Sequence, residues 1–252
     1  MTRLVLCIVG LTFPALFGTS VLRALEFDVD SLVDAPDAAI GDGVCADAGG
    51  RCSLRAAFQE ANAHPTGIAH GHVPHAITLS AGIHALSIAG ADEDASATGD
   101  LDLFVSVELL GAGRETTIVD AAQLDRVIDV HAGALLRAED LAFRNGRVEG
   151  PTTGGALRFR FEPGVDSAHR PPHRLVRMTM SNSAAHRGGA LSNLQRVVAE
   201  DVRFERNEAF GFHVVPDPLN PPAGIESFPE GGAIENGDAG LLVLLASTLA
   251  EN

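Results

Sequence analysis

The sequence lacks tryptophan and tyrosine, and because all of its basic side chains are arginines it also lacks lysine. Aromatic residues account for 5% of the 252 residues, while hydrophobic residues account for 46%. A core must therefore be built from small, branched and aliphatic side chains with some phenylalanine. Such a core suits stacked β-strands better than a globule centred on large aromatic rings.

Positive charge is scarce, since 18 arginines oppose 33 acidic residues and give a formal net charge of -15. Nucleic-acid phosphates require a basic face, so this balance argues against a nucleic-acid partner. It is also unfavourable for anionic membrane surfaces. The balance fits a soluble extracellular protein or one that binds cations.

Long apolar runs are also scarce. The run from Leu4 to Phe17 is too short to span a bilayer, which requires about 20 residues. Arg3 precedes this run and small residues follow it, so we predict a signal peptide over residues 1–20, cleaved after Ser20. Cleavage after Ala24 and a buried N-terminal strand are the alternatives. The remaining chain would be exported and would contain no transmembrane span.

The chain has only three cysteines, and Cys7 lies inside the apolar run, so it would leave with the signal peptide. Cys45 and Cys52 flank a glycine pair, and an even pair in an exported protein predicts a disulfide. Free thiols and a bound metal ion are the alternatives. A zinc site would need two further ligands, and none lies close in the sequence at matching spacing.

Residues 21–76 are predicted to form an N-terminal cap. Ser53 is a favourable helix N-cap, and apolar residues recur on one face from Leu54 onward. We expect the helix to run to about Ala63 and to end before Pro65.

Polar residues on either side of this helix could form two metal sites, and for each the alternative is a loop without bound metal. The acidic segment before the helix is either a solvated loop or a calcium site, and its aspartates are Asp28, Asp30, Asp34, Asp37, Asp42 and Asp47. The histidines after the helix lack interleaved acidic or cysteine ligands, which favours loop residues without a ligand role over a metal site. These histidines are His64, His70, His72 and His75.

From residue 77 the chain becomes a series of short apolar segments separated by glycine, aspartate and asparagine. No second helical pattern lies between them, which excludes a doubly wound α/β fold. The expected strands are Ala76–Leu79, His84–Ile88, Leu101–Phe104, Val105–Leu110, Thr117–Asp120, Val127–Val130, Leu135–Ala138 and Leu141–Phe143.

Two short phrases recur in this region. Gly-Gly-Ala followed by an apolar residue begins at Gly154, Gly188 and, with isoleucine at the end, Gly231. The second phrase has two apolar positions followed by asparagine, and one spacing, from Asn182 to Asn207, is 25 residues (207 minus 182). These repeats predict an all-β fold, a right-handed parallel β-helix over residues 77–252, in which each coil buries its inward residues on the next. The Pro-rich stretches Glu162–Arg174 and Phe210–Pro229 are expected to be loops outside the stack.

Asparagine at equivalent turns can adopt positive φ, and its amide can hydrogen-bond to the next coil. We expect two such structural ladders, for which polar ligand binding is the alternative. One comprises Asn145, Asn182, Asn207 and Asn252, and the other comprises Asn193 and Asn236. The helix residues Leu54, Phe58 and Ala61 are expected to cover the first coil. Asn252 completes a repeat phrase, so we expect the β-helix to be incomplete at the C-terminus, as in a fragment of a longer surface protein.

The segment Cys52-Ser-Leu-Arg55 resembles the CSLREA-domain family of exported bacterial proteins. Companion phrases of that family are also present, namely Gly41-Asp-Gly-Val-Cys45, Glu60-Ala-Asn62, Thr98-Gly-Asp-Leu-Asp102 and Leu124-Asp-Arg-Val127. The later Gly-Gly phrases resemble repeats of the polymorphic outer-membrane protein type. Both resemblances imply a pectin-lyase-like β-helix, secreted or at the bacterial cell surface or outer membrane. Two positions depart from these patterns: Ala56 replaces a glutamate, and Arg158-Phe159 replaces an asparagine. Neither resemblance supplies a set of catalytic residues.

The preferred function is therefore a non-catalytic, adhesin-like or structural surface protein, with glycans or a host or neighbouring cell surface as partner. A polysaccharide lyase or hydrolase acting on acidic glycans is the second hypothesis, and a calcium-binding extracellular module is the third. The weak catalytic candidates are Asp140, Arg177 and Asp201, each of which precedes an inward apolar residue of its repeat. They could form one outward column, for which a surface ladder of ion pairs is the favoured interpretation. No cofactor is expected, although calcium is possible.

Overall fold

The structure is a computed structural model that describes residues 24–65, 73–91, 93–161, 163, 170–210, 213–217, 220–227 and 232–252. The predicted signal peptide, Cys7 and two of the loop histidines, His70 and His72, lie outside the described residues. In the described part of the chain, no helix is long and apolar enough to cross a membrane.

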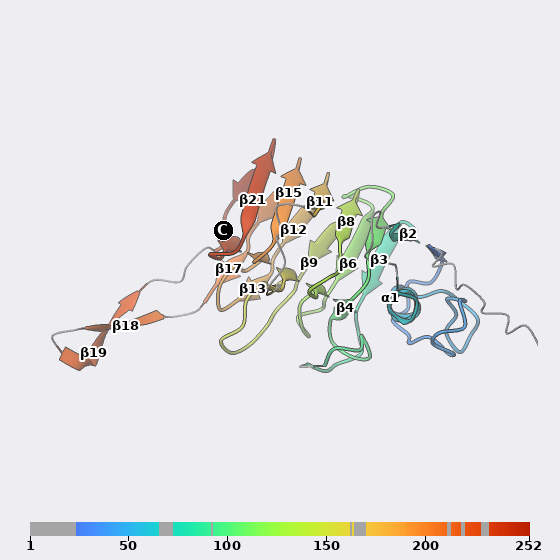
Figure 1. Cartoon of the computed structure of the whole chain (residues 1–252), viewed down its shortest axis with the longest axis horizontal. Helices are drawn as coiled ribbons and strands as arrows, with labels where there is room; N and C mark the ends of the chain where they lie inside the picture. The colour runs from blue at the N-terminus through green and yellow to red at the C-terminus, as the bar shows by residue number, and fades with distance from the viewer. Residues whose placement is uncertain are drawn as a thin grey trace, which may run out of the picture.

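Three large parallel sheets and one helix dominate the described part of the chain, which confirms the predicted parallel β architecture (Figure 1). Sheet A contains β1 (Glu26–Val29), β2 (His75–Leu79), β5 (Val107–Leu110), β8 (Leu136–Glu139), β11 (His173–Val176), β15 (Arg196–Glu200) and β21 (Leu241–Leu245). Sheet B contains β3 (Gly82–Ala85), β6 (Thr117–Asp120), β9 (Ala142–Arg144), β12 (Thr179–Ser181), β16 (Arg203–Glu205) and β22 (Thr248–Ala250). Sheet C contains β4 (Leu101–Leu103), β7 (Ile128–Val130), β10 (Leu157–Phe159), β14 (Leu191–Asn193) and β20 (Ile234–Asn236).

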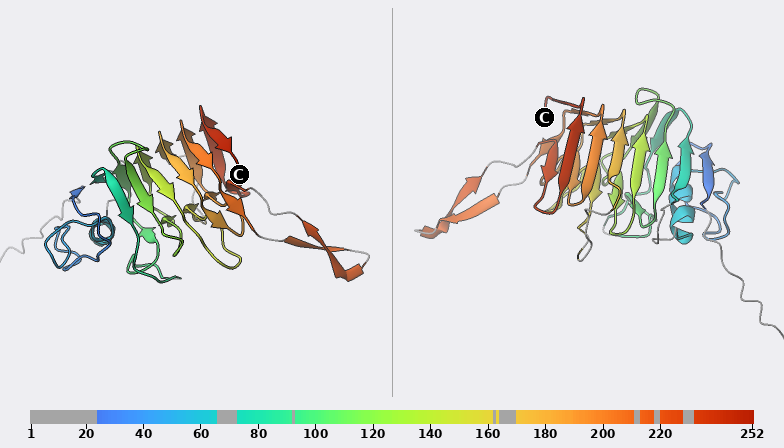
Figure 2. Two further views of the ribbon diagram at one scale, coloured as in Figure 1. Left: turned by 180° about the vertical axis from the view of Figure 1, so that it is seen from behind. Right: turned by 45° about the horizontal axis from the view of Figure 1, so that its top comes forward.

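From β2 onward the chain contributes one strand to sheet A, then one to sheet B and one to sheet C. In each sheet, the new strand pairs with the strand contributed by the previous coil. Thus β2 pairs with β5, β5 with β8 and β8 with β11, all in parallel register. The result is a solenoid-like stack, seen from two further directions in Figure 2. All eight strands expected before residue 144 overlap strands of the structure, with shifts of one or more residues at several ends.

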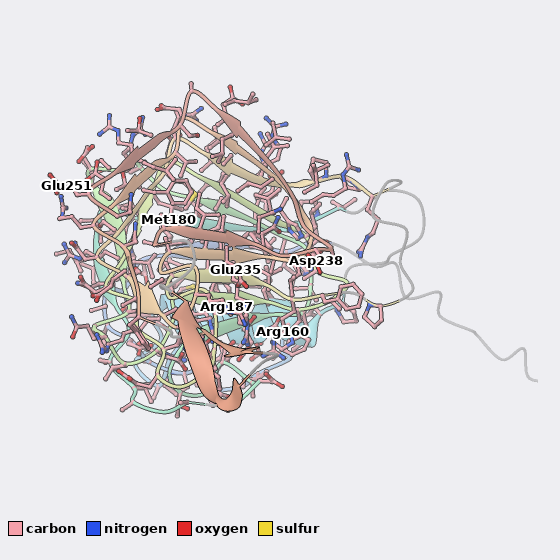
Figure 3. The ribbon with its side chains drawn as sticks, turned by 90° about the vertical axis from the view of Figure 1, so that its left-hand side faces the viewer. Arg160, Met180, Arg187, Glu235, Asp238 and Glu251 are labelled. Atoms are coloured by element: carbon pink, nitrogen blue, oxygen red, sulfur yellow. A yellow bond between two sulfur atoms is a disulfide. The ribbon has the colours of Figure 1, made fainter. Side chains whose placement is uncertain are left out.

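Inward side chains form columns that run along the stack. On sheet B, the register partners Phe143, Met180 and Phe204 are all fully buried. Viewed along the stack, Met180 lies inside the coils, whereas Glu251 lies at the periphery (Figure 3). A core made of such columns needs apolar side chains of moderate size at every coil, which explains the composition.

The turns at both ends of the sheet B strands use the left-handed region. Asp140, Arg177 and Asp201 precede β9, β12 and β16 with φ of 58°, 49° and 53°. Residues other than glycine adopt this conformation uncommonly, and asparagine and aspartate are enriched among those that do. Asp140 and Asp201 suit this turn, whereas Arg177 and, before β22, Ala246 adopt the same conformation without that preference.

The four-residue asparagine ladder expected from the sequence is divided in two. Asn145 and Asn182 follow β9 and β12 at positive φ, but after β16 the equivalent position is Arg206, with φ 52°. Asn207 lies one residue later, where its Nδ2 donates to Oδ1 of Asn252 at 3.0 Å. The asparagine follows directly after β9 and β12 but comes two residues after the end of β16. The same sequence phrase therefore places its asparagine at a different position of the turn.

The second expected ladder is present. Nδ2 of Asn193 on β14 donates to Oδ1 of Asn236 on β20 at 2.7 Å. The same Asn193 amide also donates to the carbonyl of Gln195, and its Oδ1 accepts from the Gln195 backbone N–H. These asparagines therefore fix the turn that leads from sheet C to sheet A.

The helix and the disulfide occur as predicted. Helix α1 spans Leu54–Ala63, and the Ser53 hydroxyl accepts a hydrogen bond from the Ala56 backbone N–H. Cys45 and Cys52 are joined, with Cα atoms 5.0 Å apart. The helix contacts β1, β2 and β4 at one end of the stack, and its residues Leu54, Phe58 and Ala61 are buried (Figure 1).

Two other expectations are wrong. His75 does not lie in a loop: it begins β2 and is fully buried, with Nδ1 accepting from the Leu25 backbone N–H. The segment expected to be a loop between Phe210 and Pro229 contains an antiparallel hairpin, made of β18 (His213–Asp217) and β19 (Asn220–Ser227). A short parallel pair, β13 (Ala184–Ala185) with β17 (Glu208–Ala209), lies beside the main sheets.

Candidate functional site

The predicted column at the A-to-B turns is an exposed row of ion pairs. Arg177 donates to both carboxylate oxygens of Asp140, at 2.7 and 2.6 Å, and also pairs with Glu139. Asp201 pairs with Arg114 instead. These hydrogen bonds lower the pKa of Asp140 and of Asp201, respectively. The three residues therefore neutralise their neighbours at the surface, which agrees with the favoured interpretation of a salt-bridge ladder.

A different part of the surface, the outer face of sheet C, holds a polar cleft of about 260 Å³. Its walls come from three segments between strands, which contribute residues 91, 93 and 94, residues 123–126, and residues 147–149 and 152. Arg158 on β10, together with Arg160, also lines it. In the view along the stack, Arg160, Arg187 and Glu235 lie on the same side of the molecule (Figure 3).

The cleft lies over charged residues that point away from the core in the middle of sheet C strands. Asp102 on β4, Asp129 on β7 and Arg158 on β10 are register partners. Each lies between two buried apolar residues of its own strand, so the alternation of the strand directs it outward. Neighbouring strands are about 4.8 Å apart, which brings these three charges side by side.

Asp129 is the centre of a compact ion network. Arg158 and Arg160 both donate to its carboxylate, and Nη1 of Arg126 lies 3.3 Å from Oδ2. Burial by itself would raise the pKa of Asp129, but the hydrogen bonds from Arg158 and Arg160 lower it to about 2. This carboxylate is therefore ionised at all physiological pH values and holds three guanidinium groups beneath the cleft.

Asp100 lies in the same network but behaves in the opposite way. Nη1 of Arg126 is 2.8 Å from its Oδ2, yet burial raises the pKa of Asp100 to about 8, aided by the neighbouring carboxylates Asp125, Asp102 and Asp129. Below that pH the Asp100 carboxyl is protonated and can donate a hydrogen bond.

Two arginine N–H groups on this face are buried and have no hydrogen-bond partner among the described residues. They are Nε of Arg126, under the cleft, and Nε of Arg187, whose Nη1 pairs with Glu235 on β20 at 3.3 Å. A buried donor without an acceptor is costly, and a bound oxygen atom would remove that cost.

The N-terminal cap holds one wall of this cleft in place. Arg55 of α1 is fully buried, pairs with Asp34 at 2.6 Å and donates to the carbonyls of Ser96 and Gly99. Gln59, one turn later, donates to the same Ser96 carbonyl at 3.0 Å. The polar residues of the helix thereby fix the segment that precedes β4, where Asp94 and Asp100 lie.

The same helix organises the acidic segment that the sequence left open as a loop or a calcium site. Glu60 is buried and accepts from the backbone N–H groups of Gly41 and Gly43. Asp37 accepts from the backbone N–H groups of Ala39 and Ala46. Several of these carboxylates thus hold backbone, and within the described residues this segment shows no group of three potential metal ligands.

Comparisons with protein-family models, curated proteins and solved structures find no match to this chain. The cleft is therefore interpreted from its own chemistry.

Sequence reasoning did not single out the residues of the cleft. The available signal was a charged residue between two apolar residues in three successive coils, at Asp102, Asp129 and Arg158. Two companion phrases, ending at Asp102 and at Val127, also lie at the cleft. The coils that carry Asp102, Asp129 and Arg158 differ in length, so the sequence did not show that these three residues are register partners.

Proposed function

We propose that this chain is an exported bacterial protein related to the CSLREA-domain family, built as a right-handed, pectin-lyase-like parallel β-helix. We infer a non-catalytic, adhesin-like role in which the outer face of sheet C binds glycans on a cell surface. The order of strands in three stacked parallel sheets supports the β-helix. The disulfide supports export, because such bonds persist in oxidising compartments.

The observation that carries the proposed binding role is the polar cleft on the outer face of sheet C, where Arg126 and Arg158 offer guanidinium groups. Glycan hydroxyl and carboxylate oxygens are acceptors of the kind that these donors require. The cleft contains exposed arginine as well, since Arg147 and Arg160 line it. A rigid sheet with preformed donors binds such a ligand without a large ordering cost.

Binding should be measured on an array of neutral and uronic-acid glycans with the purified protein. Arg147→Gln removes an exposed guanidinium group from the wall of the cleft and should weaken retention on the array by about fivefold or more. Arg177→Gln is the matched control, because it removes an exposed arginine from a different face. Equal loss in both variants, or no glycan retained by the unaltered protein, would contradict the proposal.

A polysaccharide lyase or hydrolase is the second candidate, and one specific observation favours it. Asp100 lines the cleft, and burial raises its pKa to about 8, so a protonated carboxyl would be available there as a general acid. A lyase acting on uronic-acid polymers would release an unsaturated product that absorbs ultraviolet light. Turnover abolished by Asp100→Asn would support the enzyme. Turnover abolished by Arg177→Ala would instead place the reaction at the turn column.

A further inference from the structure

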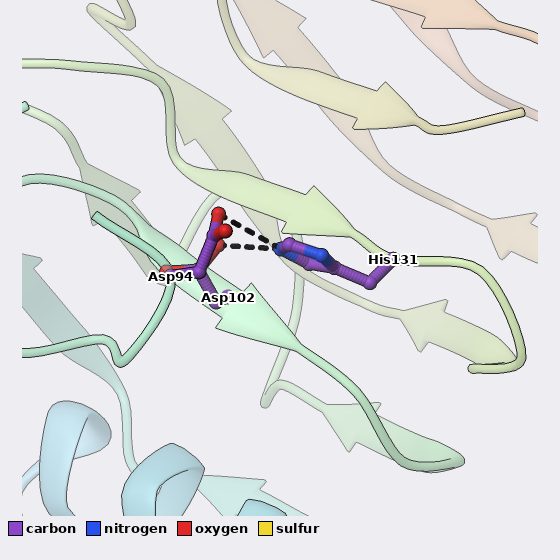
Figure 4. Close-up of side chains that lie close together, drawn as sticks. All are labelled: Asp94, Asp102 and His131. Atoms are coloured by element: carbon purple, nitrogen blue, oxygen red, sulfur yellow. Dashed lines mark hydrogen bonds and ion pairs between the residues drawn. The ribbon is translucent and has the colours of Figure 1, made fainter. Parts of the chain in front are cut away.

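Three potential metal ligands meet at one side of the cleft. They are Oδ1 of Asp94, Oδ1 of Asp102 and Nε2 of His131, and all three atoms lie within 4.8 Å of one another (Figure 4). The imidazole Nε2 is 2.7 Å from the Asp102 oxygen and 3.6 Å from the Asp94 oxygen. In Figure 4 both carboxylates point toward the same ring nitrogen.

Strand pairing fixes two of these ligands. Asp102 is the middle residue of β4, and His131 follows β7, the strand that pairs with it. The His131 backbone N–H donates to the Leu103 carbonyl at 3.0 Å, so the two residues are held by adjacent backbone. The imidazole also lies against the Phe104 ring, with centroids 3.8 Å apart, which restricts its rotation.

Asp102 is the most deeply buried carboxylate of this cluster. Its side chain is 1% exposed, and a buried carboxylate requires a cationic or hydrogen-bonding partner. The buried carboxylates of Asp34 and Asp129 pair with arginine, and that of Glu60 pairs with His64 and accepts from two backbone N–H groups. Among the described residues Asp102 pairs with no arginine, and its side-chain oxygens face His131 and the Ser96 backbone N–H.

We propose that Asp94, Asp102 and His131 bind one divalent transition-metal ion, with Zn²⁺ as the best fit. Zn²⁺ accepts imidazole nitrogen and carboxylate oxygen at about 2.0–2.2 Å and commonly takes three protein ligands plus a water or ligand oxygen. Ca²⁺ instead needs six to eight oxygen ligands at longer distances, and three ligands including an imidazole do not supply them.

Metal binding requires two small rearrangements. The 2.7 Å separation between His131 Nε2 and Asp102 Oδ1 must open to roughly 3.3 Å, the ligand spacing of a tetrahedral site, as the ion replaces the shared proton. Arg160 Nη2, which lies 2.8 Å from Asp94 Oδ1, must release that oxygen. Arg160 retains its bonds to the buried Asp129 when it does so.

The fourth coordination position would face the cleft. The Asp94 side chain is 59% exposed and lines the cleft, whereas the side chains of Asp102 and His131 are buried. A metal ion here would tie the segment that carries Asp94 to sheet C. It would also place a Lewis acid beside Arg160. This inference does not depend on the proposed glycan binding.

The test is calorimetric titration of the purified full chain, freed of metal by chelation, with Zn²⁺ alone. We expect one equivalent to bind. Asp94→Asn alters an exposed ligand, leaves the buried residues unchanged and should weaken Zn²⁺ binding by about tenfold or more. His131→Ala should weaken Zn²⁺ binding by about a hundredfold. His186→Ala is the matched control and should bind Zn²⁺ as the unaltered chain does.

Co²⁺ provides a second measurement that does not depend on affinity. We expect the visible absorption bands of a four-coordinate Co²⁺ complex, displaced by Zn²⁺ and absent from His131→Ala. Zn²⁺ binding that survives both His131→Ala and Asp94→Asn would overturn the assignment, as would absence of binding by the unaltered chain. Ca²⁺ competing as strongly as Zn²⁺ would overturn the choice of metal. Circular dichroism of each variant verifies that the fold is retained.

Discussion

The two ends of the stack present the same kind of coil in different surroundings. At the first coil, β1 pairs with β2, and α1 packs against β4, so Phe58 is fully buried. At the last described coil, Leu249 is 53% exposed, although its register partner Phe204 in the previous coil is 0% exposed. Likewise Leu244 is 40% exposed beside the fully buried Ala199. An inward position in a solenoid is therefore buried only when another layer lies on it.

The difference also extends to polar groups. The helix at the first coil carries buried polar side chains that bond to neighbouring backbone, including Arg55, Gln59 and Glu60. Asn62 completes the set by donating to the Asp102 carbonyl and accepting from the Phe104 backbone N–H at the edge of β4. A helix can cover a sheet edge only if it satisfies that edge in this way.

The largest expected effect of a substitution is at the covered end. Phe58→Ala should reduce the free energy of unfolding by about 3–5 kcal/mol, because it leaves a cavity under the helix. Leu249→Ala, at the exposed coil, should cost less than about 1 kcal/mol. Urea unfolding followed by circular dichroism measures both. Similar losses in the two variants would mean that burial at the two ends does not differ in solution.

Breaking the buried ion pair of the cap should have a comparable effect. Arg55→Met leaves the Asp34 carboxylate buried without its partner and should cost about 3–5 kcal/mol. The double variant Arg55→Met/Asp34→Leu should recover part of that loss. Arg51→Met is the matched control, because Arg51 and Asp30 are both more than half exposed, and it should change stability by about 0–1 kcal/mol. A double variant less stable than Arg55→Met alone would argue against this account.

The pH dependence of the unfolding free energy tests burial in the middle of the stack, between the two ends. His173 on β11 is buried, and burial lowers its pKa to about 4 from an ordinary value of 6.5. The unfolded chain therefore binds a proton at this histidine first as the pH falls, so the contribution of His173 to stability is complete above pH 6.5 and is lost as the pH approaches 4. The raised pKa of Asp100 acts in the opposite direction between pH 8 and pH 4, so the contribution of His173 is measured as the difference between the unaltered chain and a His173→Gln variant. This difference should be about 3 kcal/mol.

Between pH 6.5 and pH 4 the unaltered chain should therefore lose more unfolding free energy than His173→Gln does. Burial also lowers the pKa of His75, so a histidine contribution should remain in that variant. Equal losses in the two proteins would mean that His173 is not the group responsible.

The smallest of these effects concerns the disulfide of the cap. Replacing Cys45 and Cys52 by serine should reduce stability by about 2–3 kcal/mol, because the bond closes a short loop of the unfolded chain. Thermal unfolding of the variant and of the reduced unaltered protein should agree. Labelling of the unreduced, denatured protein should detect neither of these two thiols, and labelled thiols at both positions would contradict the bond.

Local patterns predicted the local features correctly. Helix α1 has the predicted limits because an N-cap at Ser53, a continuous apolar face and Pro65 all act within a few residues of one another. The strands before residue 144 were located because each is a short apolar segment bounded by glycine, aspartate or asparagine within a few residues. The asparagine phrase failed at Arg206 because one extra residue in a turn changes the structural position while leaving the sequence phrase recognisable.

The sequence by itself determined that the chain builds stacked parallel strands from small apolar residues, that one helix covers an end, and that Cys45 and Cys52 pair. Each of these follows from neighbours in the chain. Only the tertiary structure decided which charges meet. Asp94, Asp102 and His131 come together because coils of different length bring β4 and β7 into register, about 4.8 Å apart, whatever their separation in sequence. For the same reason Asp129 pairs with three arginines, while the weak catalytic candidates Asp140, Arg177 and Asp201 lie at the surface in ion pairs.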